Sequence, residues 1–417
     1  MLDVLEKTLN NKKEEYLGHL KKLLSIDTQT IGHGILGGKE KEGQEYIQKL
    51  LSDLGAEIKK EDLDEALLKQ AYETYNEGNL GHNNKDRYNI IGDFKGKKDK
   101  TIIFNGHIDT MPYGEKEAWK HDPLDPVVED GKVYGLGSTD MKGGLMAGIM
   151  AVKLIKDSGL ELPCNVKIMS VADEEGGGNG TITAMMNKDT GDAAVVCEPS
   201  DNEILIAHMG FVFFKVSVKG KALHSAGKWN GVNAIEKAVS LIHELGELEK
   251  EWLMKYKHPL LPPPTLNVGV INGGTAGSTV PDFCEFKVCV HYLPGIMSFS
   301  QVKQEFERRI FLRSQGDEFL KDNLPEVEIY QLGGGFEMDS LDEFVKFVHE
   351  KANETADIPI NGGIAGNDAR LLKNLGNIPT VILGPGRLVD CHSIDESISI
   401  DEYFKYIKIY ADLIMSF

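Results

Sequence analysis

The chain has few cysteines, and they follow no metal-binding or disulfide pattern. Their number is odd, and no two of them form a C-x-x-C motif. A disulfide framework or a thiolate zinc site needs paired or closely spaced cysteines. We therefore expect reduced and mostly buried thiols at all five positions, which are Cys164, Cys197, Cys284, Cys289 and Cys391.

Long apolar runs and an excess of positive charge are also missing. No apolar stretch approaches the roughly 20 residues that span a bilayer, and the charged, amphipathic first 24 residues lack the apolar core of a secretory signal. Lys and Arg total 46 against 65 Asp and Glu, a formal net charge of −19. Nucleic acids and anionic membranes are bound by clustered Lys and Arg. We expect a cytoplasmic protein that binds neither of them.

The length and the residue pattern predict two domains. A chain of 417 residues is longer than one usual domain of about 100–200 residues. Strand-like and helix-like segments alternate over residues 1–209 and 336–417, which predicts an α/β domain with a mostly parallel sheet and helices on both faces. Residues 210–335 follow the order β-α-β-β-α-β of a ferredoxin-like α+β unit. Residues 59–87 are polar and partly helical and are interpreted as an insertion.

Acidic residues and a histidine follow three of the predicted strands. His107 and Asp109 occur in NGHIDTMP, Glu174 and Glu175 in VADEEGGG, and Glu198 in VVCEPS. Binding sites of open α/β sheets form beyond the carboxyl ends of the strands. The adjacent glutamates are typical either of a solvated turn or of a site in which one binds metal while the other transfers a proton.

Two further candidates come from glycine-containing segments. Asp140 lies in GLGSTDMKGG and His392 in LGPGRLVDCHSIDES. Asp140 is equally suited to capping the next helix, whereas a phosphate-binding loop lacks the G-x-x-x-x-G-K-[ST] pattern. Two histidines and three carboxylates, each expected at a strand end, suit two divalent cations with one bridging carboxylate and one bridging water. Zn²⁺ is the expected metal, with Co²⁺ and Mn²⁺ as alternatives.

The ordered motifs make the chain similar to a known family. GHIDT, GLGSTDMKGG, DEEGG, CEPS, HSA, GVNAI, VPD, GPG and HSIDE resemble the dinuclear metallohydrolases that include aminoacylase, acetylornithine deacetylase, succinyl-diaminopimelate desuccinylase and the glutamate carboxypeptidases. The likeness covers nearly the whole chain and is greatest to acetylornithine deacetylase-like members. It implies that His107 and His392 each bind one metal, that Asp140 bridges both, and that Glu175 and Glu198 complete the two sites.

The resemblance also implies catalytic roles and an assembly. Glu174 is expected to be the general base that deprotonates the bridging water and later protonates the leaving amine. Asp109 is expected to orient His107. His224, in KALHSAGKWNG, is expected to donate to the oxyanion from the inserted domain, often across a subunit boundary. Because this domain acts as lid and dimer contact in many relatives, we expect a homodimer.

Three residues bear on the substrate. Relatives often carry Asn where this chain has Ser278 and Arg where it has His291, and those residues help hold the substrate's carboxylate and oxyanion. Arg370, in NDARLL, matches an arginine found in part of the family and is a candidate carboxylate clamp. Glu at position 198 is usual in deacylases and carboxypeptidases, whereas aminopeptidases usually carry Asp. The substrate is expected to be a small N-acyl amino acid, or an N-acyl amine without an α-carboxylate.

Three functions are compatible with these motifs. The first is deacylation at a linear amide bond, as in acetylornithine deacetylase. The second is a dipeptidase or carboxypeptidase activity of the same family, which shares the chemistry and therefore the motifs. The third is a non-catalytic binding module on the same scaffold, and the presence of Glu174 together with all five expected metal ligands argues against it.

Overall fold

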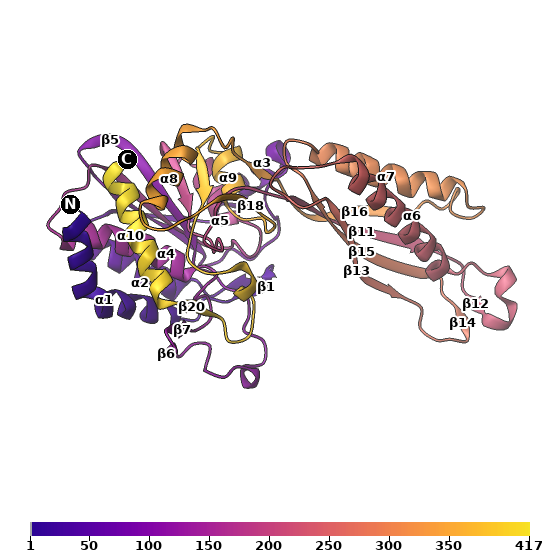
Figure 1. The fold of residues 1–417 in the computed structure, drawn as a ribbon. Coiled ribbons are helices and arrows are strands. Elements are labelled where there is room, and N and C mark those ends of the chain that lie inside the picture. The colour runs from indigo at the N-terminus through magenta and orange to yellow at the C-terminus, as the bar shows by residue number, and fades with distance from the viewer. Residues whose placement is uncertain (1) are drawn as a thin grey trace. The chain divides into compact units, whose positions relative to one another are not determined.

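The computed structural model describes residues 2–417, which form two compact units (Figure 1). The first unit comprises Met1–Ile206, Met338–Gly363 and Asn367–Phe417, and the second comprises Ala207–Glu337 and Ile364–Gly366. The short segment 364–366 was not part of the predicted division. No helix within residues 2–417 is long and apolar enough to cross a membrane.

The large sheet has the strand order β17-β10-β19-β9-β5-β8-β4-β3, and β18 also pairs with β10; its residues belong to the first unit except for β17 and the end of β10. The strands are β3 (Glu57–Asp62), β4 (Tyr88–Phe94), β5 (Lys98–His107), β8 (Cys164–Val171), β9 (Ala193–Val196), β10 (Ile204–His208), β17 (Phe336–Glu337), β18 (Ile360–Gly363) and β19 (Thr380–Ile382). β8 and β9 are buried along their whole length, as continuous apolar strands of a covered sheet are. The α/β class predicted from the sequence is confirmed.

The sheet is mixed, so the expectation of a mostly parallel sheet was wrong. β19, β9, β5 and β8 run parallel to one another in the centre. β4 pairs antiparallel with β8, β3 pairs antiparallel with β4, and β10 pairs antiparallel with β19. Residues 95–97 join β4 to β5, and a parallel crossover needs a dozen or more residues. The short link therefore forces β4 to run opposite to β5, with β8 between them.

Two groups of helices pack against this sheet. α4 (Lys142–Asp157) packs against α1 (Leu2–Leu24) and α10 (Ile400–Ser416), and α10 also packs against α8 (Glu343–Asn353). The other group consists of α3 (Glu65–Tyr75), α5 (Asn179–Met186) and α9 (Ala369–Asn374), while α2 (Lys41–Asp53) lies against β4. α4 is buried at every position from its start to Val152, because an apolar helix of this kind belongs inside the fold.

Residues 59–87, interpreted as an insertion, contain an integral part of the sheet. β3 pairs with β4 over six residue pairs and forms the edge of the sheet. α3 follows directly, and the Asp64 side chain caps it by accepting from the backbone amides of Ala66 and Leu67. Only the loop after Asn76, the left-handed C-cap of α3, lacks regular structure until β4 begins.

Short strands organise the loops above the sheet. β20 (Ser397–Ser399) pairs with β7 (Lys132–Tyr134), which also pairs with β6 (Val127–Glu129). β20 follows the HSIDE segment and β7 precedes the GLGSTD segment, so their pairing brings these two loops together. The remaining short elements of this unit are β1 (Thr30–Gly34), β2 (Gly37–Gly38) and the 3-10 turns η1 (Lys116–Ala118) and η3 (Leu388–Asp390).

The second unit has the predicted order β-α-β-β-α-β. Its antiparallel sheet has the order β13-β15-β11-β16, and α6 and α7 pack together and line the apolar core with it. The elements are β11 (Gly210–Lys219), α6 (Ala234–Lys255), β13 (Thr265–Gly273), β15 (Phe283–Tyr292), α7 (Phe299–Gln315) and β16 (Glu326–Gly333), with the short pieces β12 (Leu223–His224), η2 (Ser225–Asn230) and β14 (Thr279–Val280). Buried and partly buried residues alternate strictly along β11, which is why its sequence pattern predicts a strand.

All five cysteines are free thiols, as expected. Cys164, Cys197 and Cys284 are buried, and Cys289 and Cys391 are partly buried.

Candidate metal centre

Three neighbouring parallel strands deliver side chains to one edge of the large sheet. His107 is the last residue of β5, Glu198 follows β9, and Glu174 and Glu175 follow β8. β5 lies between β9 and β8 and is parallel to both. The carboxyl ends of parallel strands meet at the same edge, so residues up to 91 positions apart converge there.

The other two candidate ligands come from loops, so the expectation of five strand ends was wrong. Asp140 lies between β7 and α4, and His392 lies between η3 and β20. The alternative that Asp140 caps the next helix does not hold either, because α4 begins at Lys142 with Met141 in the N-cap position. The pairing of β20 with β7 is what places the two loops side by side.

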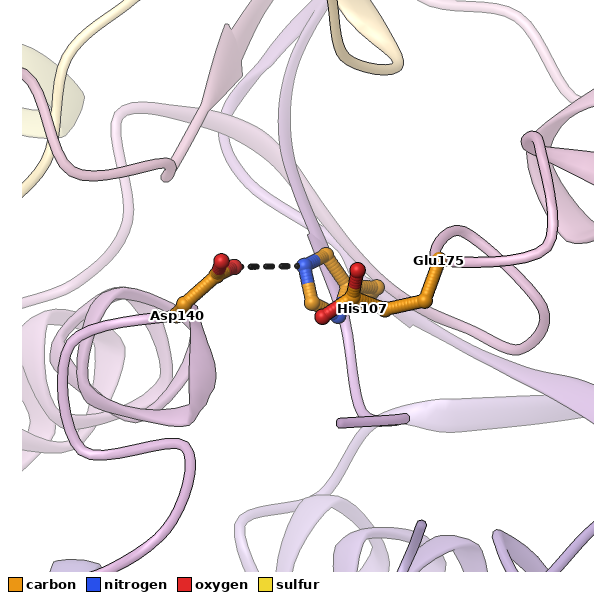
Figure 2. Close-up of side chains that lie close together, drawn as sticks. All are labelled: His107, Asp140 and Glu175. Carbon is orange, nitrogen blue, oxygen red and sulfur yellow. Dashed lines mark hydrogen bonds and ion pairs between the residues drawn. The ribbon is translucent and has the colours of Figure 1, made fainter. Parts of the chain in front are cut away.

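His107 points its Nε2 atom at carboxylates (Figure 2). Nε2 lies 3.0 Å from Asp140 Oδ1 and 3.5 Å from Glu198 Oε1. On the other side of the ring, Nδ1 lies 2.8 Å from the backbone carbonyl oxygen of Asp109. A ring that donates from Nδ1 to a carbonyl keeps Nε2 as the metal-binding atom, and this arrangement orients His107 for that purpose.

His392 faces the other oxygen of the same aspartate. Its Nε2 lies 3.1 Å from Asp140 Oδ2 and 3.0 Å from Glu175 Oε1. The Asp140 carboxylate therefore stands between the two histidines, with one oxygen directed at each. This is the geometry in which one carboxylate bridges two cations.

Glu174 lies at the same place without contacting either histidine closely. Its Oε2 atom is 3.9 Å from His107 Nε2. Two overlapping groups each bring three ligand atoms within 4.8 Å of one another: His107, Asp140 and Glu175 form one, and His107, Glu174 and Glu198 the other. The donor set of imidazole and carboxylate fits Zn²⁺, Co²⁺ or Mn²⁺.

The charges of the cluster also fit bound cations. Burial raises the pKa of Glu198 to about 7, and burial raises the pKa values of Glu174 and Glu175 as well. Burial by itself lowers the pKa of His107, but the carboxylates of Glu198, Asp140 and Glu174 outweigh it and raise that pKa well above its usual value. Several buried carboxylates repel one another electrostatically unless cations offset their negative charge. The residues present therefore fit a pair of divalent metals.

Asp109 contacts the His107 ring through its backbone carbonyl and not through its carboxylate. Its carboxylate oxygen lies 3.8 Å from His107 Nδ1, beyond hydrogen-bond distance, and it is the backbone carbonyl of Asp109 that accepts from His107. The carboxylate instead accepts from the backbone amides of Glu174 at 3.2 Å and Glu175 at 3.0 Å. Asp109 thus holds the turn that carries both glutamates, because the backbone amides of this turn point at the Asp109 carboxylate.

Glu396 supports the Asp140 loop and was not identified from the sequence. Its carboxylate accepts from the backbone amides of Gly137, Thr139 and Asp140 at 2.8 to 2.9 Å. Burial raises its pKa to about 8. The signals in the sequence were its place at the end of the HSIDE motif and the glycine-rich loop, whose backbone amides need an acceptor when they are buried.

Arg370 does not have the open position that a substrate clamp needs. It is 1% exposed, and its Nε donates to Glu77 Oε2 at 3.1 Å. Its other nitrogens donate to the carbonyl oxygens of Asn367 and Gly177. We therefore correct the predicted role: the guanidinium is committed to the protein, because a buried arginine requires a counterion and acceptors.

The remaining predicted residues belong to the second unit. The β12–β14 pairing sets His224 opposite Thr279, and the Ser278 carbonyl accepts from the Ser225 amide, so His224 and Ser278 lie in adjoining segments. Ser278 precedes the first residue of β15, Phe283. His291 is the second-last residue of β15 and lies opposite Phe211 on β11. The structure therefore does not bring His291 together with Ser278.

A pocket opens beside His392. Its remaining walls are mostly apolar or aromatic and come from the segment after β5, from the loop before α4 and from the HSIDE loop. The lining residues are Thr110, Met111, Pro112, Tyr113, Trp119, Leu136, Asp140, Glu175, His392, Ser393, Ile394 and Glu396.

An α/β sheet that gathers two histidines and several carboxylates beyond the ends of its central strands defines a metallohydrolase scaffold. The chain belongs to peptidase family M20/M25/M40, whose model matches residues 103–416. It is 30% identical over 443 residues to the N-formyl-4-amino-5-aminomethyl-2-methylpyrimidine deformylase of Bacillus subtilis (strain 168), covering 99% of this chain and 96% of that protein. It is 30% identical over 332 residues to the acetylornithine deacetylase of Pasteurella multocida (strain Pm70), covering 76% and 80%.

Solved structures share the fold. The M20 family metallo-carboxypeptidase from Sulfolobus solfataricus superposes with a TM-score of 0.76 at 20% sequence identity, covering 96% of this chain and 98% of that one.

Proposed function

We propose that this protein hydrolyses a linear amide bond and removes a small acyl group from an amine or amino acid. The observation that carries the proposal is the position of Asp140, which directs one carboxylate oxygen at each of two histidines. A hydrolytic deacylase of this family needs two cations held at a short, fixed separation, and a shared carboxylate provides that separation.

Two divalent cations are part of the proposal, with Zn²⁺ first and Co²⁺ or Mn²⁺ as alternatives. His107 and Glu198 would hold one ion, His392 and Glu175 the other, and Asp140 both. When bound, such ions polarise the amide carbonyl and lower the pKa of water.

Glu174 is proposed as the group that moves the proton. It accepts a proton from the attacking water and returns it to the departing nitrogen. Two observations support this role. Its Oε2 atom lies 3.9 Å from His107 Nε2, farther than the oxygens of Asp140 at 3.0 Å and Glu198 at 3.5 Å. In addition, burial raises its pKa, which brings a carboxylate closer to the pH at which it both accepts and donates protons.

His224 is proposed as the donor to the oxyanion. Its Nδ1 accepts from the backbone amide of Ala226 at 3.1 Å. The ring therefore carries its proton on Nε2 when it is neutral, and the exposed Nε2–H is available to donate.

The substrate is proposed to be a small N-acylated amine, with a formyl or acetyl group as the acyl part. The named activities of the Bacillus subtilis and Pasteurella multocida relatives, deformylation and deacetylation, support this choice. The pocket beside His392 supports it as well, since Tyr113, Trp119 and Leu136 suit a flat or apolar group. The lining contains no Lys or Arg, and Arg370 is committed elsewhere, so no basic side chain among the described lining residues is placed to clamp an α-carboxylate.

We further propose that the second unit acts as a lid and that two copies of the chain associate through it as a homodimer. β13 is the edge strand of its sheet, and an uncovered edge strand pairs readily with another chain. Val270 and Ile271 on this strand are 42% and 47% exposed. A cytoplasmic location is proposed on the basis of the five free thiols, which are typical of a reducing compartment.

The test is a substrate panel with and without a chelator. Protein loaded with Zn²⁺ or Co²⁺ is assayed against N-formyl, N-acetyl and N-succinyl amines and amino acids, and against dipeptides. We expect hydrolysis of an N-acyl amine that is lost with a chelator and restored by metal. Faster cleavage of dipeptides would assign the protein to the peptidases of the family instead, and hydrolysis that is insensitive to chelators would remove the metal from the mechanism.

A further inference from the structure

The turn that carries Glu174 and Glu175 has few internal bonds of its own. Within residues 173–178, the Gly177 amide donates to the Glu174 carbonyl, and the Gly178 amide donates to the carbonyls of both Asp173 and Glu174. Asp109 holds the turn from the side of β5. A turn with three consecutive glycines keeps one shape only when neighbouring groups hold it.

Residues 77–82, here called the strap, lie in the loop between α3 and β4 and also contact this turn. Asn79 Nδ2 donates to the Gly176 carbonyl oxygen at 2.6 Å. The backbone of Asn79 is itself fixed, because its amide donates to Asn179 Oδ1 at 3.1 Å and its carbonyl accepts from Asn179 Nδ2 at 3.0 Å. Asn79 is therefore bonded to the first glycine of the run and to Asn179, the residue that follows the run.

The strap also reaches the residue that precedes the two glutamates. His82 Nδ1 lies 2.8 Å from Asp173 Oδ2, and both side chains are buried. Asp173 has a φ of 62°, a conformation that a non-glycine residue keeps only when its surroundings impose it. Arg87, just beyond the strap, forms an ion pair with the other carboxylate oxygen at 2.8 Å. Both oxygens of Asp173 are thus held by residues of the loop that follows α3.

A third contact reaches the turn through an arginine. Glu77 accepts from Arg370 Nε at 3.1 Å, and Arg370 Nη2 donates to the Gly177 carbonyl oxygen at 2.9 Å. Gly177 also packs tightly against Asn79. A Cβ atom at position 177 would collide with Asn79 Nδ2, and the φ of Gly177 is 119°. The carbonyls of Gly176 and Gly177 each therefore have a donor in, or held by, the strap.

We propose that residues 77–82 are a positioning segment for the two glutamates of the metal centre, with Asn79 and His82 as its principal residues. The inference rests on the proposed function, in which Glu174 moves the proton and Glu175 binds metal. The strap touches neither carboxylate. It holds the Asp173 side chain before them and the Gly176 and Gly177 carbonyls after them, so that one turn directs two adjacent side chains to two different tasks.

The principal test compares two variants of Asn79 with a control in the same segment. Asn79→Asp keeps the size of the side chain but turns an acceptor towards the Gly176 carbonyl, and Asn79→Ala removes the donor. Leu80→Ala is the control, because Leu80 is 43% exposed. The full-length, metal-loaded proteins are assayed with the N-acyl amine selected by the substrate panel, and Co²⁺ titrations followed by absorption measure metal binding separately.

We expect both Asn79 variants to lower kcat by about 10- to 100-fold, with KM changed less than about twofold and Co²⁺ affinity about tenfold weaker. The Leu80 control should match the wild type. Full retention of kcat and Co²⁺ affinity in folded Asn79 variants would overturn the proposal. A wild type that takes up no Co²⁺ and hydrolyses no amide would overturn the proposed function first, and this role with it.

His82 gives a second test that does not depend on whether the Asn79 variants fold. His82→Ala removes one of the two donors to Asp173 Oδ2 and leaves Asn179 as the other, and His82→Asn replaces the lost donor with an amide nitrogen at a similar position. We expect kcat to fall about tenfold or more in His82→Ala and to recover most of that loss in His82→Asn, at equal metal content. Equal kcat in both variants and the wild type would contradict the positioning role, whatever the change in thermal stability.

Discussion

The two histidines of the ligand set contact the same carboxylate from very different surroundings. His107 ends a central strand, its side chain is 1% exposed, and the Asp109 carbonyl holds its ring. His392 lies in a loop, has a φ of 53°, and its side chain is 50% exposed. Asp140 meets both of them at 3.0 and 3.1 Å.

This difference separates a buried half of the centre from an open half. In the buried half, His107 and Glu198 are placed by strands that the core already holds rigid, and a carboxylate there is costly without a cation. In the open half, His392 depends on a loop and on the β20–β7 pairing. We therefore expect the metal on the His392 side to exchange more readily, because loops open more easily than core strands.

The largest expected effect belongs to neither half. Glu174→Gln should lower kcat by about 10²–10⁴-fold, because the amide cannot accept the proton. Both metals should stay bound, since Glu174 is not one of the proposed ligands. Activity assays combined with metal analysis of the same sample check this, and wild-type-like turnover would remove Glu174 from its role.

The second prediction compares the halves directly. In metal-free protein, His107→Ala should lower the free energy of unfolding by about 3 kcal/mol, because it leaves buried carboxylates without their counterion. His392→Ala should cost less than His107→Ala, because the His392 ring is half exposed and water screens its ion pairs.

Each of these two variants should also lose the metal ion on its own side and keep the second metal ion. Urea denaturation in a chelator and metal stoichiometry after reconstitution measure the two quantities. Equal destabilisation by both substitutions would show that the buried and open halves are equivalent, contrary to the comparison.

The smallest expected effect is shared by the two halves. Glu396→Gln weakens the acceptor of three backbone amides that hold the Asp140 loop, and we expect kcat to fall about tenfold. Since Asp140 faces both histidines, the affinities of both metals should weaken together. Val389→Ala, at a 72% exposed position between Arg387 and the HSIDE loop, is the control. A loss confined to one metal would indicate that Glu396 serves one half only.

Much of the fold was predictable because local pattern carries it. The order of elements in the second unit follows from alternation in strands such as β11 and from periodicity in α6. The strand neighbours were not predictable, and the mixed sheet shows why. β8 lies between β4 and β5 although β4 and β5 are joined directly, and no local pattern states which strands pair.

The candidate site divides in the same way. His107, Asp140, Glu175, Glu198 and His392 stand out in the sequence as polar residues after apolar strands or glycine turns, and the structure gathers them. Arg370 was misinterpreted because its counterion, Glu77, lies 293 positions away. The second contact of Asp109 was not predictable, because its carboxylate accepts from the amides of Glu174 and Glu175, which lie in the turn after another strand.

The sequence by itself determined which residue types are available for chemistry and which segments become strands and helices. Only the tertiary structure decided which groups hold them, namely Glu396 under the Asp140 loop, Asp109 and the strap on the two sides of the glutamate turn, and β20 against β7. The physical reason is that side-chain periodicity is a local property of the chain. Hydrogen bonds to backbone groups join segments far apart in sequence and leave no local pattern.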